Sequence, residues 1–461
     1  MAPAKPKKVT ISQEAFNDLV NENIEDLGME PDEALQDAIQ TLTLQGVDLS
    51  GIITSPNNTS PLIQSLDSLK HFDSVNVDDI ELDELLKSFD HLSQLCSSDS
   101  EEGLAKVAIA IRNGGVEVVC SICSKIPVDS DRALVSGLKA LASLLRDLQS
   151  TDTFQKVDGP RIVVGIIRNG SQKLDILDSG FSVVAAASTG NEIVKASFMD
   201  LKIDELILQI MMEQKKGSIQ CLYDAIRVLL TADDNRVVAS EVYGYARRFA
   251  KLGIAGALVE SLQGGLSSPG LVSASIALKA VAVNDEICRS IADNGGIDAI
   301  LQCIDDGSEQ GNRIVARGCC SLLSTLAGSD TNKNAIVAKS GLDRLIKLSS
   351  RFSEDPSVIQ EVMSIICALC LRSPENAARA VEAGAGDLAI QAMQKFPGAS
   401  QMQRNSCMMI RNLVVRNPEN RTLLLNNGIE KIIRRTKETH ESCKDAAAAA
   451  LRDLGLDNYN A

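Results

Sequence analysis

Two Cys-x-x-Cys pairs are the residues of this chain whose type and spacing best suit chemistry. Cys120 with Cys123, and Cys367 with Cys370, could together supply the four thiolates of a zinc site. Each pair lies inside an apolar run with helical spacing, where a thiol packs as a small hydrophobic side chain. We therefore expect buried thiols rather than a metal site, and a reducing compartment, the cytoplasm or the nucleus.

Other catalytic patterns are missing from the sequence. The three histidines, His71, His91 and His440, do not have the spacing of metal ligands. The chain also lacks a phosphate-binding glycine loop with a lysine, a nucleophile elbow and the kinase signatures. We expect a protein that is not an enzyme and that needs no cofactor and no metal.

A nearly periodic glycine organises most of the chain, and a short apolar run follows each copy. Neighbouring copies are 43 to 45 residues apart, except for one interval of 51. Repeats of this length cannot bury their own apolar faces and have to stack on their neighbours. We predict an all-α solenoid in which glycine closes a first helix in a left-handed conformation, before a second and a long third helix. The copies start at Gly115, Gly159, Lys202, Gly253, Gly296, Gly341, Gly384 and Gly428, where Lys202 replaces a lost glycine.

Several segments resemble the armadillo repeat, including Met-Ile-Arg-Asn-Leu at 409–413, Asn-Pro-Glu-Asn-Arg at 417–421 and Asn-Gly-Ile at 427–429. More specifically, the chain resembles the armadillo repeat-containing protein 6 family from about residue 9 to 456. That resemblance implies a right-handed superhelix of armadillo repeats and a role in protein binding, without a defined mechanism. The segments that carry it are residues 11–16, 22–25, 45–50, 403–413 and 449–455.

Charge is distributed unevenly along the chain. Residues 1–102 contain 5 Lys, no Arg and 21 acidic residues, whereas residues 103–461 contain 41 basic and 40 acidic residues. This balance argues against sequence-independent binding to nucleic acid, and no apolar run is long enough to cross a membrane. We divide the chain into a helical arm at 1–53, an acidic linker and helix at 54–102, about eight armadillo repeats at 103–456 and a tail at 457–461.

The acidic arm has the pattern of two amphipathic helices, which end near Gly28 and Gly46. Two short helices either pack against each other, dock on the repeats or fold on a partner. After the arm we expect a flexible linker over residues 54–77 and an acidic amphipathic helix over residues 78–98.

In armadillo proteins the third helix of each repeat lines the groove. The resemblance therefore implies that positions about 17 residues before each glycine, on the third helices, face the groove. Only Asn412 matches the asparagines by which peptide-clamping armadillo proteins hold a backbone, which argues against recognition of nuclear-localisation signals. The groove candidates are Arg227, Lys279, Arg411, Asn412 and Arg452. A basic C-terminal patch adds Arg404, Arg416, Arg421, Lys431, Arg434, Arg435 and Lys437. These charges form either an anion-binding surface or a set of solvated side chains and local ion pairs.

The third repeat is longer than the others, because Arg227 lies 26 rather than 17 residues before Gly253. We expect an inserted loop of nine residues that offers Tyr and Arg side chains to a partner. The alternative is a longer loop packed on its own repeat. The inserted-loop candidates are Tyr243, Tyr245, Arg247 and Arg248.

The sequence thus predicts a monomeric, non-catalytic scaffold or adaptor that binds proteins through the groove and the inserted loop. One alternative is a chaperone or assembly factor whose acidic arm shields a basic client. Another is a regulator that contacts nucleic-acid complexes. We also hypothesise that the acidic arm docks within the chain on the basic residues between 401 and 440 and masks them.

Overall fold

The computed structural model describes residues 9–11, 13–49, 52, 54, 61–75, 82–214, 219–238 and 240–457. Residues 55–60 of the predicted linker and residues 458–461 of the predicted tail lie outside this set. The chain divides into two compact units, which we describe separately. Unit 1 comprises Met1–Leu206 and Ala232–Val238, and unit 2 comprises Ile207–Thr231 and Ala239–Ala461.

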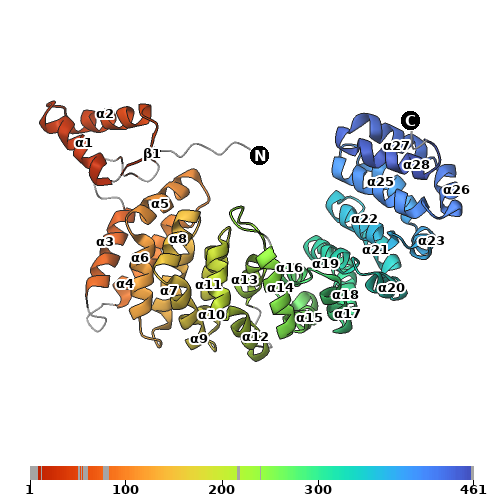
Figure 1. Cartoon of the computed structure of the whole chain (residues 1–461), viewed down its shortest axis with the longest axis horizontal. Coiled ribbons are helices and arrows are strands. Elements are labelled where there is room, and N and C mark those ends of the chain that lie inside the picture. Colours follow the sequence, from red (N-terminus) through yellow and green to blue (C-terminus); the bar gives the residue numbers. More distant parts are fainter. Residues whose placement is uncertain are drawn as a thin grey trace. The chain divides into compact units, whose positions relative to one another are not determined.

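The arm in unit 1 folds around a small apolar core of its own (Figure 1). Helices α1 (Gln13–Glu25) and α2 (Pro31–Leu44) pack against each other, and β1 (Val9–Thr10) pairs in parallel with β2 (Val47–Asp48). The sequence left open whether these helices pack against each other, dock on the repeats or fold on a partner. In the structure they pack against each other. The buried core residues are Phe16, Leu35, Ala38, Leu42 and Ile52.

Unit 1 continues with stacked helices, and it includes one that the sequence analysis missed. Part of the predicted flexible linker, residues 61–74, is helical, so that prediction was wrong there. Leu62, Leu66 and Leu69 are buried at helical spacing, a signal hidden among serines and charged residues. The helices are α3 (Pro61–Ser74), α4 (Leu82–Cys96), α5 (Glu101–Arg112), α6 (Gly115–Lys125), α7 (Asp131–Leu144), α8 (Leu148–Lys156), α9 (Gly159–Asn169), α10 (Leu174–Ser188) and α11 (Glu192–Asp200).

Helices α3 and α4 behave as the second and third helices of an incomplete first repeat. Helix α3 packs on α6 and α4 packs on α7, in the same way as α6 packs on α9 and α7 on α10. The stack in unit 1 therefore begins before residue 103, inside the segment that the sequence analysis assigned to a linker and helix.

Unit 2 repeats the same three-helix pattern, and each third helix packs on the next. Helix α12 (Ile203–Glu213) contains the boundary between the units. Within the described residues, α5 to α28 make eight complete three-helix repeats. The remaining helices are α13 (Gln220–Leu229), α14 (Ser240–Leu252), α15 (Ile254–Gln263), η2 (Gly265–Ser267), α16 (Leu271–Val281), α17 (Asp285–Asp293), α18 (Gly296–Glu309), α19 (Arg313–Leu326), α20 (Asp330–Ala338), α21 (Gly341–Arg351), α22 (Pro356–Cys370), α23 (Pro374–Glu382), α24 (Ala385–Lys395), α25 (Ser400–Val414), α26 (Pro418–Asn426), α27 (Ile429–Thr439), η3 (Glu441–Cys443) and α28 (Lys444–Asp453).

A left-handed residue separates the first and second helices of every complete repeat, but it is often not the glycine that the sequence analysis chose. Positive φ angles occur at Gly114, Asp158, Lys202, Gly253, Gly295, Ser340, Gly384 and Gly428. The prediction was therefore one residue late in four repeats, where the recurring glycine instead begins the second helix. A Cβ atom there would lie 2.6–2.8 Å from the carbonyl oxygen five residues earlier. This close approach leaves no room for a side chain, which explains why glycine occupies the position. The four glycines are Gly115, Gly159, Gly296 and Gly341.

No single helix among the described residues is long and apolar enough to cross a bilayer. Helices α5 and α6 reach the necessary length only when they are joined across a bend of 68°.

Candidate functional site

All five groove candidates lie on third helices of unit 2, but side chains of the same chain already engage them. The Nε atom of Arg411 on α25 donates to Asp453 Oδ2 on α28 over 2.7 Å. The Nζ atom of Lys279 on α16 donates to Ser321 Oγ on α19 over 2.7 Å. Half-buried Arg452 is not a free cation either. Arg227 on α13 lies 3.8 Å from Asp224, so carboxylates partly neutralise both Arg227 and Arg411.

The single groove asparagine connects two helices of the fold. Asn412 Nδ2 donates to the carbonyl oxygen of Cys367 on α22 over 2.9 Å. Two turns earlier on α25, Asn405 Nδ2 donates to Ser364 Oγ over 3.0 Å. Because both amides bridge α22 and α25, Asn412 does not present its amide to a bound peptide as the armadillo comparison implied.

Two other arginines on the third helices are exposed and have no partner among the described residues. Arg404 lies seven residues, or two helical turns, before Arg411, and Arg317 lies at the matching place on α19. Gln360 holds the equivalent position on α22, which packs between these two helices. Arg404 was among the candidates predicted from the sequence, whereas Arg317 was not. Counting a further seven residues back from Ser324, on the same helical face, would have found it.

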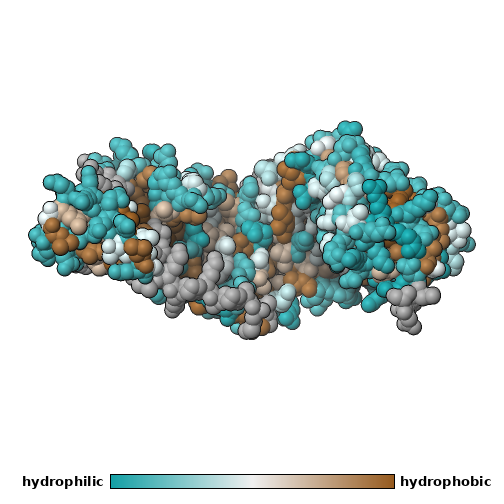
Figure 2. Space-filling view, turned by 90° about the horizontal axis from the view of Figure 1, so that it is seen from above, coloured by the Kyte–Doolittle hydropathy of each residue, from teal (hydrophilic) through white to brown (hydrophobic). Residues whose placement is uncertain are grey.

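The surface around these arginines combines small polar and exposed apolar side chains. Ile314 is 61% exposed, Ile276 40% and Met408 38%, all on third helices of unit 2. In Figure 2 the hydrophobic residues form separate patches within a mainly hydrophilic surface. Such isolated apolar positions can add contacts beside a charged anchor without exposing a continuous hydrophobic band.

The basic C-terminal patch is divided among several elements. Its residues occupy α25, the loop that follows, α26 and α27, and thus all three helices of the repeat pattern. On α27, Arg434 donates to Glu430 Oε1 over 2.8 Å and to Asp457 Oδ1 over 3.2 Å. Lys437 lies 3.8 Å from Asp457 Oδ2. The carboxylates therefore offset part of the positive charge that the sequence suggested.

The four inserted-loop candidates lie on helix α14, so their assignment to a loop was wrong. Val242, Ala246 and Phe249 are buried at helical spacing and hold that helix on the repeat. Tyr243 remains 50% exposed, and its carbonyl oxygen accepts a hydrogen bond from Arg247 Nε. The insertion lengthens α14, the first helix of the following repeat, as well as the loop before it, whereas the sequence-based prediction placed all of it in the loop.

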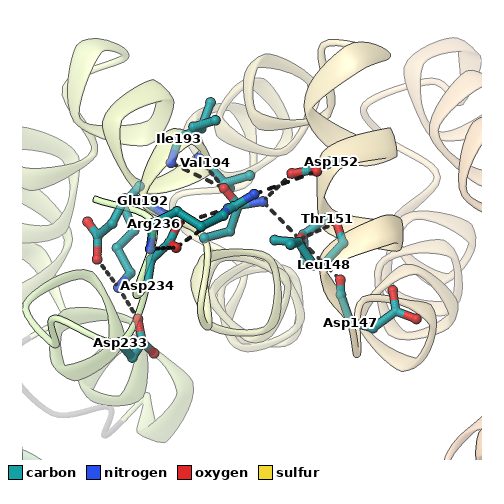
Figure 3. A network of polar contacts seen from close by, with 12 residues as sticks. Asp147, Leu148, Thr151, Asp152, Glu192, Ile193, Val194, Asp233, Asp234 and Arg236 are labelled. Atoms are coloured by element: carbon teal, nitrogen blue, oxygen red, sulfur yellow. Dashed lines mark hydrogen bonds and ion pairs between the residues drawn. The ribbon is translucent and has the colours of Figure 1, made fainter. Parts of the chain in front are cut away.

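Residues 232–238 of that loop belong to unit 1 and pack on α11, the first helix of their own repeat (Figure 3). The backbone N–H of Glu192 donates to Asp234 Oδ2 over 3.1 Å. Arg236 donates to the same carboxylate through Nε over 2.9 Å and through Nη2 over 2.8 Å. The Arg236 side chain in particular holds the pKa of Asp234 well below its ordinary value, against the opposing effect of burial. This is the packed arrangement that the sequence analysis kept as the alternative to a binding loop.

A fully buried lysine lies beneath this segment. Lys195 Nζ donates to Glu192 Oε1 over 2.9 Å and to Asp233 Oδ1 over 2.5 Å, so one carboxylate comes from α11 and the other from the loop. Asn191 caps α11 and its amide donates to Asp152 Oδ1 on α8 over 2.8 Å. The charges of the loop are thus satisfied within unit 1.

The cysteines behave as apolar core residues. All twelve are free; ten are buried and two, Cys221 and Cys367, are partly buried. Burial raises the pKa of the Cys123 thiol to about 12, which disfavours the thiolate that binds metals. Among the described residues, no group of three or more His, Cys, Asp or Glu side chains is arranged to hold a metal ion.

Comparison with known proteins agrees with this repeat architecture. The chain is 27% identical to Armadillo repeat-containing protein 6 of Pongo abelii over 399 residues, which cover 81% of this chain and 76% of the relative. The Drosophila melanogaster homolog is 24% identical over 384 residues, covering 81% and 80%. The crystal structure of an engineered protein aligns over 87% of this chain and 97% of its own with a TM-score of 0.64 at 16% identity, which speaks for the fold alone.

Two family models together account for nearly the whole sequence. The model described as Armadillo repeat-containing protein 6 N-terminal domain matches residues 8–68, which include the arm. The model described as ARMC6 matches residues 62–458, which include both α3 and the repeats. The resemblance inferred from the sequence is confirmed, and the chain, an all-α armadillo-repeat solenoid, belongs to the armadillo repeat-containing protein 6 family.

Proposed function

We propose that this chain is a non-catalytic scaffold that binds partner proteins through its third helices. The observation that supports this proposal most is that the third helices carry opposite net charge in the two units. Repeat proteins bind along such extended surfaces, and complementary charge selects partners and speeds their association.

In unit 1 the third helices are mainly acidic, whereas in unit 2 they are mainly basic. Helices α4, α7 and α10 carry three basic and six acidic residues: Lys87, Arg132, Lys139, Asp83, Glu84, Asp90, Asp131, Asp175 and Asp178. The third helices of unit 2 carry eight basic and four acidic residues: Arg227, Lys279, Arg313, Arg317, Arg404, Arg411, Lys444, Arg452, Asp224, Glu361, Asp445 and Asp453. One chain therefore offers different surfaces to basic and to acidic partners.

Crosslinking with mass spectrometry tests this proposal. The full chain is incubated with cell extract, its complexes are crosslinked and the crosslinked residues are mapped to helices. We expect crosslinks to concentrate on or beside third helices, with acidic partner segments at unit 2. Crosslinks confined to first and second helices would contradict the proposal. Treatment of the extract with nuclease separates direct protein partners from nucleic-acid complexes, the class that one alternative requires.

A second candidate function, an assembly factor that shields a basic client, draws support from the arm. Residues 9–53 contain ten acidic residues and neither Lys nor Arg, and α1 and α2 form their own core. A test compares the full chain with a variant in which exposed Glu22, Glu25, Asp26 and Glu30 are replaced by their amides. Loss of the ability to keep poly-lysine soluble, with third-helix crosslinks unchanged, would favour this function over the scaffold.

The hypothesis that the arm masks basic residues between 401 and 440 remains a proposal, supported by the charges alone. Limited proteolysis at low and high salt tests it, because added salt screens exposed charges. We expect the arm to be cleaved faster at high salt in the natural chain. A charge-reversed R404E/R435E chain should already show fast cleavage at low salt, and equal rates in both chains would refute the masking.

We place this scaffold in the cytoplasm or the nucleus, as a monomer. Twelve free cysteines, mostly buried, suit a reducing compartment. Fluorescence microscopy of the tagged full chain and analytical ultracentrifugation of the purified chain test the two statements separately.

A further inference from the structure

We infer that α19, α22 and α25 of unit 2 form a binding site for an acidic peptide, with Arg317 and Arg404 as its two anchors. The inference rests on the proposed scaffold function and deepens it, because it assigns a location and a partner chemistry to one of the third-helix surfaces.

The anchors occupy the same register on the outer two of three packed helices. Helix α22 packs on both α19 and α25. Neighbouring packed helices lie about 8–10 Å apart, so the two arginine positions are separated by roughly 16–20 Å. An extended peptide rises ~3.3 Å per residue, and about six residues therefore cover this distance. The geometry suits a peptide that crosses the three helices with carboxylates about six residues apart.

Both anchors are available to a ligand, in contrast to the other cations on these helices. Arg317 and Arg404 are exposed and unpaired within the described part of the chain. Arg411 is bonded to Asp453. The pKa of Asp355 is lowered mainly by a hydrogen bond from Ser357 and to a smaller extent by the charge of Arg313, so the charge of Arg313 is partly offset. The guanidinium group of arginine matches a carboxylate in a bidentate pair, which makes an unpaired arginine a strong anchor.

The surface between the anchors can accept a peptide backbone. Half-buried Gln360 lies midway, and its side-chain amide can both donate and accept hydrogen bonds. Ser364 is short, Ser321 accepts a hydrogen bond from Lys279 of the neighbouring helix α16, and Asn405 is fixed by its bond to Ser364. Exposed Met408 beside this surface offers an apolar contact to a side chain of the peptide.

The same helices fit a peptide better than a nucleic acid. In their full length, α19, α22 and α25 contain no Phe, Tyr or Trp on which bases could stack. Two free cations are few for a phosphate chain, whose affinity grows with the number of neutralised phosphates. Glu361 on α22, the one carboxylate of the three helices, also repels a ligand with continuous negative charge. Discrete carboxylates at the spacing of the anchors avoid that repulsion.

Fluorescence anisotropy with synthetic peptides tests the site in the full chain. The probe is a labelled peptide of Ser and Leu residues with two glutamates six positions apart, and the comparison peptide has glutamines there. We expect R317E and R404E each to weaken binding of the probe about tenfold, the loss of one charge-assisted hydrogen-bonded pair. The matched control is R351E on α21, which reverses an exposed arginine of a second helix that has no partner among the described residues, and it should leave binding unchanged.

Several outcomes would overturn the site. Equal weakening by all three reversals would mean that only net charge matters, and equal affinity for both peptides would mean that the carboxylates are not recognised. Tighter binding of single-stranded RNA, lost in the same two variants, would assign the surface to nucleic acid. Binding of the probe only after the arm's carboxylates are neutralised would support the site and identify the arm as its occupant in the free chain.

The melting temperature of each variant tests its folding, and crosslink mapping tests the scaffold proposal independently of peptide binding. Because both anchors are exposed, R317E and R404E should melt within a few degrees of the natural chain; R317Q and R404Q replace any reversal that unfolds. If the variants bind the probe normally while crosslinks still map to third helices, this inference fails and the scaffold proposal stands. Absence of third-helix crosslinks removes the scaffold proposal itself.

Discussion

The backbone N–H of Glu192 donates a hydrogen bond to the carboxylate of Asp234, so a residue of the inserted segment binds the first turn of helix α11. A carboxylate at a helix N-terminus is stabilised by the unpaired N–H groups and the helix dipole there. The loop is fixed in this way although 41 residues lie between the two partners.

Replacing Asp234 by Asn should destabilise unit 1. The amide keeps the shape of the side chain but removes the negative charge. The carboxylate that accepts hydrogen bonds from the Glu192 backbone N–H and from Arg236 Nε is lost. We expect a loss of about 1–3 kcal/mol in the free energy of unfolding, measured by urea denaturation. The neighbouring exposed Asn235 gives the control, since N235A should change stability by less than about 0.5 kcal/mol. Similar losses in both variants would mean that the carboxylate contributes nothing specific.

The stabilisation from Asp234 should persist well into acid. Its pKa is depressed in the folded chain, so its contribution is fully present above the unfolded value of about 3.9 and disappears as pH falls through the lower folded pKa. The difference in unfolding free energy between the natural chain and D234N should therefore be constant from pH 7 to about 5 and shrink below about pH 4. A difference that already declines between pH 7 and pH 6 would show that another group is responsible.

Removing the buried amino group of Lys195 alone should lower the free energy of unfolding more than removing it together with the charges of Glu192 and Asp233. K195M leaves the carboxylates of Glu192 and Asp233 without their common donor, at a cost of about 3–5 kcal/mol. Adding E192Q and D233N to K195M removes the unpaired charges and should recover a large part of this loss. Equilibrium unfolding of the single and triple variants measures both values, and a triple variant less stable than K195M would refute the explanation.

Replacing Lys202 by Gly should stabilise the chain. Lys202 has a φ of 62°, a left-handed conformation that costs a residue with a side chain roughly 1–2 kcal/mol, whereas Gly adopts it freely. Allowing for the greater freedom of Gly in the unfolded chain, we expect a gain of about 0.5–1 kcal/mol by thermal unfolding. The exposed ion pair of Lys202 with Glu205 is lost, but such pairs contribute little. K202A serves as the control and should bring no comparable gain.

Adjacent glycines at the junction of α5 and α6 should respond to alanine for different reasons. Gly114 has a φ of 80° and open space around its Cα, so G114A meets only backbone strain, about 1–2 kcal/mol. A Cβ atom at Gly115 would lie 2.8 Å from the carbonyl oxygen of Ala110, so G115A forces the backbone apart. We expect G115A to be the more destabilising in thermal unfolding and to expose the last turn of α5 in hydrogen exchange. Equal effects would argue against the close approach.

The local periodicity of the sequence was enough to predict most helices and which residues share a helical face. It could not predict which charged side chains form ion pairs. Counting back 17 residues from Gly296 and Gly428 placed Lys279 and Arg411 on third helices, because that spacing depends only on the helical period. That Arg411 is bonded to Asp453 depends on how the last repeat stacks, 42 residues later in the chain. Arg317 was not predicted because the count ended at Ser324, two helical turns later on the same face. That Arg317 has no partner among the described residues also depends on how the repeats stack, so the sequence alone could not show it.

Errors arose where polar residues hid an amphipathic pattern or where an insertion changed the register. Helix α3 carries its buried leucines among serines, aspartates and a lysine, a composition typical of linkers. Tyr243 was assigned to a loop because the nine extra residues were all counted as loop, although Val242 and Ala246 continue a helical face.

The assignment of residues 232–238 to unit 1 has a consequence for how the chain matures during synthesis. The polypeptide leaves unit 1 after Leu206, returns for seven residues and leaves again after Val238. When the helices of unit 1 have emerged from the ribosome, residues 232–238 have not yet been synthesised. Lys195 therefore lacks its ion pair with Asp233 until those residues follow. A cut anywhere between residues 207 and 231 therefore separates Lys195 from that partner, whereas a cut after Val238 keeps both residues on one fragment.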